Sequence, residues 1–406
     1  MTLAPMQRWK FTLLAISISL GASSGASPTA AQKISSIVSI PSELTYSFPP
    51  GFIGNITENF IDTVTNDSST ARLLSAAKKA SFISYDPEFL QIIGERPSLK
   101  LIVQREDLFA DEAGIWVPEK NQVWFSSSTV NNVGNVSILD LGTSEIFTPN
   151  TSIPIVTPNG GYYFNGTVYI TGQGTATVAP CIYAIDSDTY ETRVVVNSYF
   201  GIRFNGPNDV IWLKRGSKSY MFFTDDPLSY EYTGGELPVL PNAVWRYDPQ
   251  DQSIVPVISR ADIIIPNGIA VNAEMTKLYV TDTPPRDTPG SPIPATGSPA
   301  VYSFDIDEDL FAVKKRMLGI ARNGIPDGVK VDDAGRIWTA ESEGIVVRNP
   351  RGKVIGVFNA ETLLASQDVP MANFALAGDT LVVLALQRLW TMKLAQTVIS
   401  PDRYRV

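Results

Sequence analysis

The chain of 406 residues is 44% hydrophobic and 18% charged, and it contains no histidine and one cysteine, Cys181. This hydrophobic content is typical of a globular protein and excludes wholesale disorder. Without histidine there is no Ser-His-Asp triad, Cys-His dyad or His-ligated zinc, and one cysteine excludes disulfides within the chain and thiolate metal sites. The net charge of −9 argues against a nucleic-acid partner, because an acidic surface repels phosphate. Chemistry must therefore use carboxylates, amides, hydroxyls, Lys, Arg, Tyr or a bound hard cation.

The first 31 residues have the layout of a secretory signal peptide. Arg8 and Lys10 precede an apolar run from Phe11 to Leu20, and small residues follow as far as Ala31. An apolar run of this length is too short to cross ~30 Å of hydrocarbon, which argues against a membrane anchor. Five Asn-x-Ser/Thr sequons agree with export, namely Asn55, Asn66, Asn135, Asn150 and Asn165. We therefore expect a secreted, extracellular glycoprotein without a membrane partner.

A pattern of β-rich runs separated by turns recurs six times after Asp111. Each copy has a run centred on a large apolar anchor, and the anchors are Trp124, Tyr169, Phe222, Tyr279, Trp338 and Val382. The anchors are 45, 53, 57, 59 and 44 residues apart, and a further β-rich run follows each one. Several strands per repeat at this period are typical of a β-propeller, whereas a β-sandwich does not predict six phased copies. We predict an all-β, six-bladed β-propeller with a short N-terminal extension.

The domain organisation follows from where the repeats begin. Residues 1–31 are the signal peptide, residues 32–110 an N-terminal extension with a ring-closing strand, and residues 111–406 the propeller, which forms a single domain with residues 85–110. Leu99 to Val103 reads as the strand that closes the ring by joining the last blade. The segment from Pro284 to Pro299 contains six prolines. We predict it to be a stiff loop of the fourth repeat that stands beside the channel mouth and shapes substrate choice. The alternative is a solvated surface insertion without a role.

Every repeat carries an oxygen-bearing side chain 9 to 14 residues before its anchor. These residues are Glu112, Asn159, Asn208, Asn267, Asp327 and Asn373. Because the first strand of each blade lines the central channel, residues at its start converge at one mouth. Taken singly, Asn267-Gly268 and Asp327-Gly328 are ordinary turn dipeptides. Their recurrence at one phase favours a site.

Four of these residues suit a metal centre in a narrow channel. Glu112 and Asp327 provide carboxylates, and Asn208 and Asn267 provide amide oxygens. Ca²⁺ or another hard divalent cation accepts six to eight such oxygens, with water completing the set. Zinc would recruit His or Cys.

The motifs at these positions resemble those of the senescence marker protein/gluconolactonase-type six-bladed propellers, and most closely their secreted lactonohydrolases. The resemblance runs from about Tyr85 to the end of the sequence, and its motifs are Thr157-Pro158-Asn159-Gly160-Gly161, Asn205 to Asp209, Phe223-Thr224-Asp225, Pro266-Asn267-Gly268, Val280-Thr281-Asp282 and Pro326-Asp327-Gly328. The resemblance implies a calcium ion, or another divalent cation, held by Glu112, Asn208, Asn267 and Asp327. We predict that Asp327 is catalytic, either as the base that activates water or by direct attack, and that Asn159, Asn205 and Asp225 contact substrate.

The sequence departs from the family pattern in four places. Glu112-Ala113-Gly114 replaces the usual E-G-P, and Asp111 stands where many relatives carry His. Gly206 aligns with the Arg that regucalcin-type members use on substrate, and Asp226 is additional to the usual F-T-D-P. The metal ligands are therefore carried over more fully than the substrate contacts.

We predict a secreted, Ca²⁺-dependent lactonase that hydrolyses a small-molecule lactone to the hydroxy acid. Two alternatives remain open. One is a biosynthetic cyclase or isomerase of the strictosidine-synthase-like propeller type, which does not need the four metal ligands. The other is a non-catalytic binding propeller, which would use a metal for structure only. The sequence makes no prediction of oligomeric state.

Overall fold

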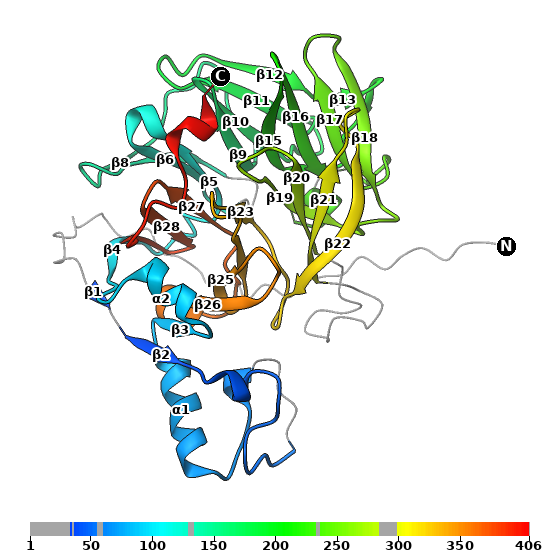
Figure 1. The fold of residues 1–406 in the computed structure, drawn as a ribbon. Coiled ribbons are helices and arrows are strands. Elements are labelled where there is room, and N and C mark those ends of the chain that lie inside the picture. The colour runs from blue at the N-terminus through cyan, green and yellow to red at the C-terminus, as the bar shows by residue number, and fades with distance from the viewer. Residues whose placement is uncertain are drawn as a thin grey trace. The chain divides into compact units, whose positions relative to one another are not determined.

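The structure is a computed structural model that describes residues 33–34, 36–54, 60–128, 134–232, 236–283 and 299–405. Strands dominate these residues (Figure 1). The predicted signal peptide, the sequon at Asn55 and nearly all of the proline-rich segment lie outside them. The other four sequon asparagines, Asn66, Asn135, Asn150 and Asn165, are exposed.

Six antiparallel sheets, which we call blades one to six, form the main body of the described fold. Blade one contains β5 (Glu112–Val117), β6 (Gln122–Ser126), β7 (Val136–Asp140) and β8 (Ile146–Phe147). Blade two contains β9 (Pro158–Phe164), β10 (Thr167–Gly172), β11 (Cys181–Asp186) and β12 (Thr192–Val196). Blade three contains β15 (Pro207–Arg215), β16 (Lys218–Asp225), β17 (Ala243–Asp248) and β18 (Ser253–Ser259).

The remaining blades continue this order. Blade four contains β19 (Pro266–Val271), β20 (Lys277–Asp282), β21 (Ala300–Ile306) and β22 (Ala312–Ile320). Blade five contains β23 (Val329–Val331), β24 (Ile337–Glu341), β25 (Gly344–Arg348) and β26 (Val354–Asn359). Blade six contains β27 (Asn373–Ala377), β28 (Thr380–Ala385), β29 (Arg388–Lys393) and β4 (Leu99–Gln104).

The first strands of the blades form the inner ring of the propeller. They contact one another in the order β5, β9, β15, β19, β23 and β27, and β27 contacts β5 again. The six anchors of the sequence repeats lie in the second strands, β6, β10, β16, β20, β24 and β28. The predicted six-bladed β-propeller is therefore confirmed, and the inner strands enclose its central channel.

A strand from early in the chain completes blade six. The strand expected at Leu99 to Val103 is present as β4, which pairs antiparallel with β29 and places Leu101 opposite Trp390. The short strand β1 (Lys33–Ile34) pairs with the other edge of β4. The ring therefore closes by hydrogen bonds between segments far apart in the sequence.

The segment before β4 also extends blade five. Strand β3 (Phe82–Ser84) pairs antiparallel with β26, and β2 (Ile37–Ser39) pairs in parallel with β3. Helix α1 (Ser68–Lys79) is capped by the Asp67 side chain, which accepts from the Thr70 N–H at 2.8 Å. Helix α2 (Pro87–Ile93) packs Phe89 against Phe358 of β26, with ring centroids 5.3 Å apart. These contacts join the predicted N-terminal extension to blade five.

The remaining elements are short. They are the 3₁₀ turns η1 (Ser42–Leu44), η2 (Phe60–Asp62), η3 (Pro118–Lys120) and η4 (Pro401–Tyr404), the helices α3 (Leu228–Tyr232) and α4 (Ala360–Leu363), and the strand pair β13 (Ser198–Tyr199) and β14 (Ile202–Arg203). None of the helices within the described ranges has the length and hydropathy needed to span a bilayer.

Candidate functional site

Each predicted metal ligand lies at the start of an inner strand. Glu112 is the first residue of β5, Asn208 and Asn267 are the second residues of β15 and β19, and Asp327 lies two residues before β23. Glu112, Asn208 and Asn267 are buried, and Asp327 is half-buried. The other residues of the same phase hold equivalent places, Asn159 in β9 and Asn373 in β27.

Contacts between neighbouring blades bring these strand starts together. The Asn373 side chain donates through Nδ2 to Glu112 Oε2 at 3.1 Å, which joins blade six to blade one. A Cβ atom at Gly160, in blade two, would lie 2.5 Å from the carbonyl oxygen of Asn208 in blade three. The six residues therefore converge at one end of the channel, as their phase predicts.

The Asn267-Gly268 pair lies inside β19 and is not a turn. A Cβ atom at Gly268 would lie 2.5 Å from the carbonyl oxygen of Asp327 and 2.9 Å from the Val329 nitrogen. Glycine is needed here because the backbone of blade five passes this close. The structure thus explains the dipeptide by packing between blades rather than by turn formation.

Gly268→Ala is expected to destabilise the protein by about 1–3 kcal/mol, because the added methyl group must push two inner strands apart. Denaturant unfolding followed by circular dichroism measures this change. Gly142→Ala is the matched control, since a Cβ atom there meets the Asp140 Oδ1 at 3.3 Å in an exposed turn. Equal stability of the two variants would contradict the packing argument.

Carboxylates crowd the site. Burial raises the pKa of Glu112 well above its usual range, and the charges of Asp327, Asp111 and Asp209 add to this rise. Burial also raises the pKa of Asp327 well above its usual range. Asp111 and Asp209 again contribute, while the Asn267 side chain opposes the rise. Mutual repulsion between buried carboxylates favours a bound cation at this place.

Several oxygen atoms at the mouth also lack partners. Within the described residues, no hydrogen bond reaches the buried Oδ1 atoms of Asn159, Asn267 and Asp327. The Asn267 Nδ2 donates to Thr283 Oγ1 at 3.2 Å, which leaves its Oδ1 as the available acceptor. Buried polar atoms are normally paired, so these three oxygens are available to a ligand or to water.

The donor set fits a hard cation. It consists of oxygens alone, with two carboxylates to balance the charge and two neutral amides. In the part of the chain that the structure describes, no three His, Cys, Asp or Glu side chains gather into a metal-binding group. The fit therefore depends on the amide oxygens of Asn208 and Asn267 together with Glu112 and Asp327.

Asp209 and Asp226 join the site although the sequence analysis did not assign them to it. Burial raises the pKa of Asp209 to about 6, and the Lys330 charge opposes this rise. Asp226 is fully buried, and its Oδ1 accepts from the Leu228 N–H at 2.9 Å. Burial raises its pKa well above the usual range; Asp225 and Asp327 add to the rise, and the Asn208 side chain opposes it. The additional Asp of Phe223-Thr224-Asp225-Asp226 thus lies beside a predicted ligand.

Two residues predicted to contact substrate have structural partners. Asp225 is fully buried and accepts from the N–H groups of Asn205, at 3.1 Å, and Gly206, at 2.8 Å. The Asn205 side chain donates to Leu240 O at 2.9 Å and accepts from the Val239 N–H at 3.2 Å. These bonds hold the loop before β15, and substrate contact by either residue stays a prediction.

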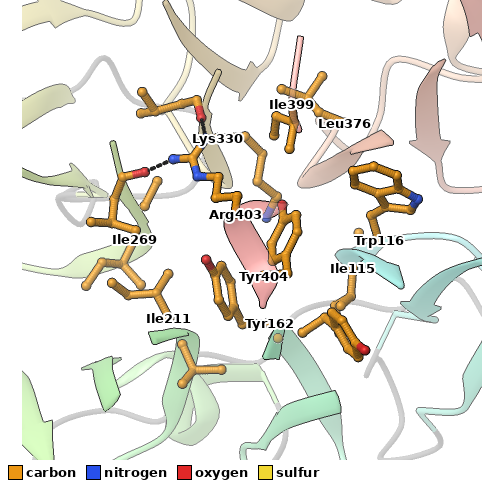
Figure 2. A pocket seen from close by; sticks show the side chains of 17 residues that line it. Ile115, Trp116, Tyr162, Ile211, Ile269, Lys330, Leu376, Ile399, Arg403 and Tyr404 are labelled. Carbon is orange, nitrogen blue, oxygen red and sulfur yellow. Dashed lines mark hydrogen bonds between the residues drawn. The ribbon is translucent and has the colours of Figure 1, made fainter. Parts of the chain in front are cut away.

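Below the strand starts, the channel contains a cavity of about 40 Å³ (Figure 2). All six inner strands line it, and Lys330 of β23 points into it. The Lys330 ammonium donates to Ala113 O at 3.2 Å. At the far side, η4 places Arg403 and Tyr404 against the cavity, and Arg403 donates to Val331 O at 2.6 Å and to Val271 O. The channel therefore has its acidic mouth at one end and η4 at the other.

Known proteins of similar sequence belong to a family whose members have this architecture. The family model described as SMP-30/gluconolactonase/LRE-like region matches residues 111–366. Lactonohydrolase oryH of Aspergillus oryzae is 25% identical over 370 residues, which cover 74% of this chain and 77% of that protein. The gluconolactonase of Zymomonas mobilis is 24% identical over 348 residues, which cover 80% of this chain and 89% of that protein.

Solved structures share the same fold. A gluconolactonase from Xanthomonas campestris superposes with a TM-score of 0.61 at 19% identity, over 77% of this chain and 93% of that one. A calcium-binding regucalcin from Agrobacterium tumefaciens superposes with a TM-score of 0.51 at 14% identity, over 75% and 97% of the two chains. The family match spans more than half of the sequence and confirms the resemblance of its motifs. The chain belongs to the SMP-30/gluconolactonase/LRE-like family.

Proposed function

We propose that this protein is a secreted, metal-dependent lactonase that hydrolyses a lactone to its hydroxy acid. The observation that carries the proposal is the convergence of Glu112 and Asp327 with the unpaired Oδ1 of Asn267 at one mouth of the channel. The curated relatives named as a lactonohydrolase and a gluconolactonase support the reaction class.

Glu112, Asn208, Asn267 and Asp327 would hold the cation, which we propose to be Ca²⁺ or another divalent ion. The oxygen-only donor set supports this choice, and so does the calcium-binding regucalcin among the structural neighbours. When bound, the cation polarises the ester carbonyl and stabilises negative charge that develops on its oxygen.

Asp327 is the proposed proton acceptor. A general base must lie within hydrogen-bond reach of the water that it deprotonates, and Asp327 offers an unpaired Oδ1 at the channel mouth. A bound cation would lower the pKa of this carboxylate. Water attacks the lactone carbonyl carbon while Asp327 takes its proton, and the bond from that carbon to the ring oxygen breaks. The same proton then passes to the ring oxygen, which becomes the hydroxyl of the product. Asn159 would accept a hydrogen bond from substrate through its unpaired Oδ1.

A panel of sugar, aliphatic and aromatic lactones, followed by acid release in a pH-stat with CaCl₂ or with EGTA, tests the proposal. We expect at least one class of lactone to be hydrolysed with CaCl₂. This activity should be lost in EGTA and should return when CaCl₂ is added back. Ring closure or isomerisation without acid release would favour the cyclase alternative. Metal binding without turnover would favour a binding propeller. Full activity after chelation, with no metal retained in the protein, would contradict the metal role.

Export is also part of the proposal. The basic, apolar and small-residue segments of residues 1–31 support a cleaved signal peptide. The exposure of Asn66, Asn135, Asn150 and Asn165 supports glycan attachment at these sequons. The mass of the protein recovered from the culture medium, before and after glycan removal, checks both.

A further inference from the structure

A buried hydroxyl group links each of four consecutive blades to the next one at the depth of the site. The bonds run from Ser126 Oγ to Asn159 O at 2.9 Å, from Thr171 Oγ1 to Asn208 O at 2.6 Å, from Thr224 Oγ1 to Asn267 O at 2.6 Å and from Thr281 Oγ1 to Asp327 O at 2.8 Å. All four hydroxyl residues are fully buried, and each lies in the second strand of its blade. Their acceptors are the main-chain carbonyls of site residues in the following blade.

Two of these hydroxyl groups also accept a hydrogen bond from their own blade. Thr224 Oγ1 accepts from the N–H of Asp209, the residue after Asn208, at 2.9 Å. Thr281 Oγ1 accepts from the N–H of Gly268, the residue after Asn267, at 2.8 Å. A hydroxyl has one donor hydrogen and two acceptor lone pairs, so each threonine can make both bonds at once. Thr224 thus connects the backbone at Asn208 to that at Asn267.

Thr281 repeats the connection one blade further on, from Asn267 to Asp327. Three of the four proposed ligands are therefore joined in sequence around the channel by single hydroxyl groups. Glu112 is held differently, because its carboxylate accepts from Asn373. In blade five the hydroxyl of Thr339 bonds Glu341 Oε1 at 2.6 Å instead of a site residue. Three of the four bridges thus end on the proposed ligands Asn208, Asn267 and Asp327, and the fourth ends on Asn159.

We propose that Thr171, Thr224 and Thr281 are positioning residues that fix the spacing of the metal ligands. This inference rests on the proposed function, since it takes Asn208, Asn267 and Asp327 as ligands. Each hydrogen bond to a carbonyl holds the backbone from which a ligand side chain projects. A cation binds more tightly when its ligands are already correctly spaced. Partners outside the ligand shell typically change metal affinity by about 10–100-fold when they are removed.

The test is Ca²⁺ binding by isothermal titration calorimetry to chelator-treated protein. We expect Thr171→Val, Thr224→Val and Thr281→Val each to weaken Ca²⁺ binding by about tenfold or more, because valine keeps the shape and removes the hydroxyl. Thr224→Ser and Thr281→Ser retain the hydroxyl and are expected to bind Ca²⁺ within about threefold of wild type. If a valine variant does not fold, the alanine variant at the same position replaces it.

Ser126→Ala is the matched control. It removes the same kind of buried bridge, but the acceptor is Asn159, which is outside the four ligands. We expect it to lower the melting temperature as the valine variants do and to leave Ca²⁺ affinity unchanged. If the wild-type protein binds Ca²⁺ but Ser126→Ala and Thr224→Val weaken that binding equally, the positioning role is overturned and the proposed metal centre is not. A wild-type protein that binds no divalent cation would overturn the proposed metal centre as well.

Discussion

Asp327→Asn is expected to lower kcat/KM for lactone hydrolysis by about 10³-fold or more, because the amide can neither accept the proton from water nor supply a negative charge. The backbone of residue 327 keeps its bonds to Thr281 and Ala340, so the fold should survive. The charges around this carboxylate repel one another without a cation. We therefore expect the metal-free variant to melt at the same temperature as metal-free wild type or higher.

The control for this variant is Asp188→Asn. It removes the same charge from a carboxylate whose side chain is 80% exposed and which pairs with Lys120 on the surface. We expect wild-type kcat/KM for the control. An Asp327→Asn enzyme that keeps more than about a tenth of wild-type kcat/KM would remove Asp327 from the mechanism, since loss of a general base typically costs 10²–10⁴-fold.

Arg348→Met is expected to destabilise the protein by about 3–5 kcal/mol, because it leaves a buried carboxylate without its partner. The Arg348 guanidinium donates to Glu341 Oε1 and to Thr339 Oγ1, each at 2.6 Å, and both charged side chains are almost completely buried. A third bond from the Arg348 guanidinium, at 3.1 Å, reaches Ile320 O in blade four. Urea unfolding followed by tryptophan fluorescence measures the loss.

Two comparisons separate charge from packing in this prediction. Adding Glu341→Gln to Arg348→Met should recover part of the lost stability, because no unpaired charge then remains in the core. Lys78→Met breaks an exposed pair with Asp62 and should cost less than about 1 kcal/mol. A small effect of Arg348→Met, within that surface range, would mean that water reaches Glu341.

The sequence predicted the fold and the placement of the site because both depend on repetition. Six anchors at a regular period indicate six blades, and residues that share a phase in a closed ring must lie near one another. This reasoning located Glu112, Asn208, Asn267 and Asp327 without any knowledge of their contacts. It also found the closing strand at Leu99, since a β-rich run without its own repeat needed a partner.

Contacts between blades could not be predicted in the same way, because a phase says where a residue lies along its strand and not what it touches. Thr224 and Thr281 stand in motifs that the sequence analysis recognised, yet their hydroxyl groups act on the following blade. Asp225 belongs to one of these motifs and accepts two backbone N–H groups. The role of Asp226 depends on the position of Asn208, which only the folded chain shows.

The closure of blade six has a consequence for the order in which the chain folds during synthesis. Gln104 of β4 and Arg388 of β29 are bonded partners 284 residues apart. At a synthesis rate of about 5–20 residues per second, β4 leaves the ribosome roughly 15–60 seconds before its partner does. Throughout that interval its edge is unpaired, and an unpaired strand edge is a template for aggregation. A chain that stops before Arg388 keeps this edge permanently unpaired. Only a chain that is synthesised through the last blade can therefore close the ring and stay soluble.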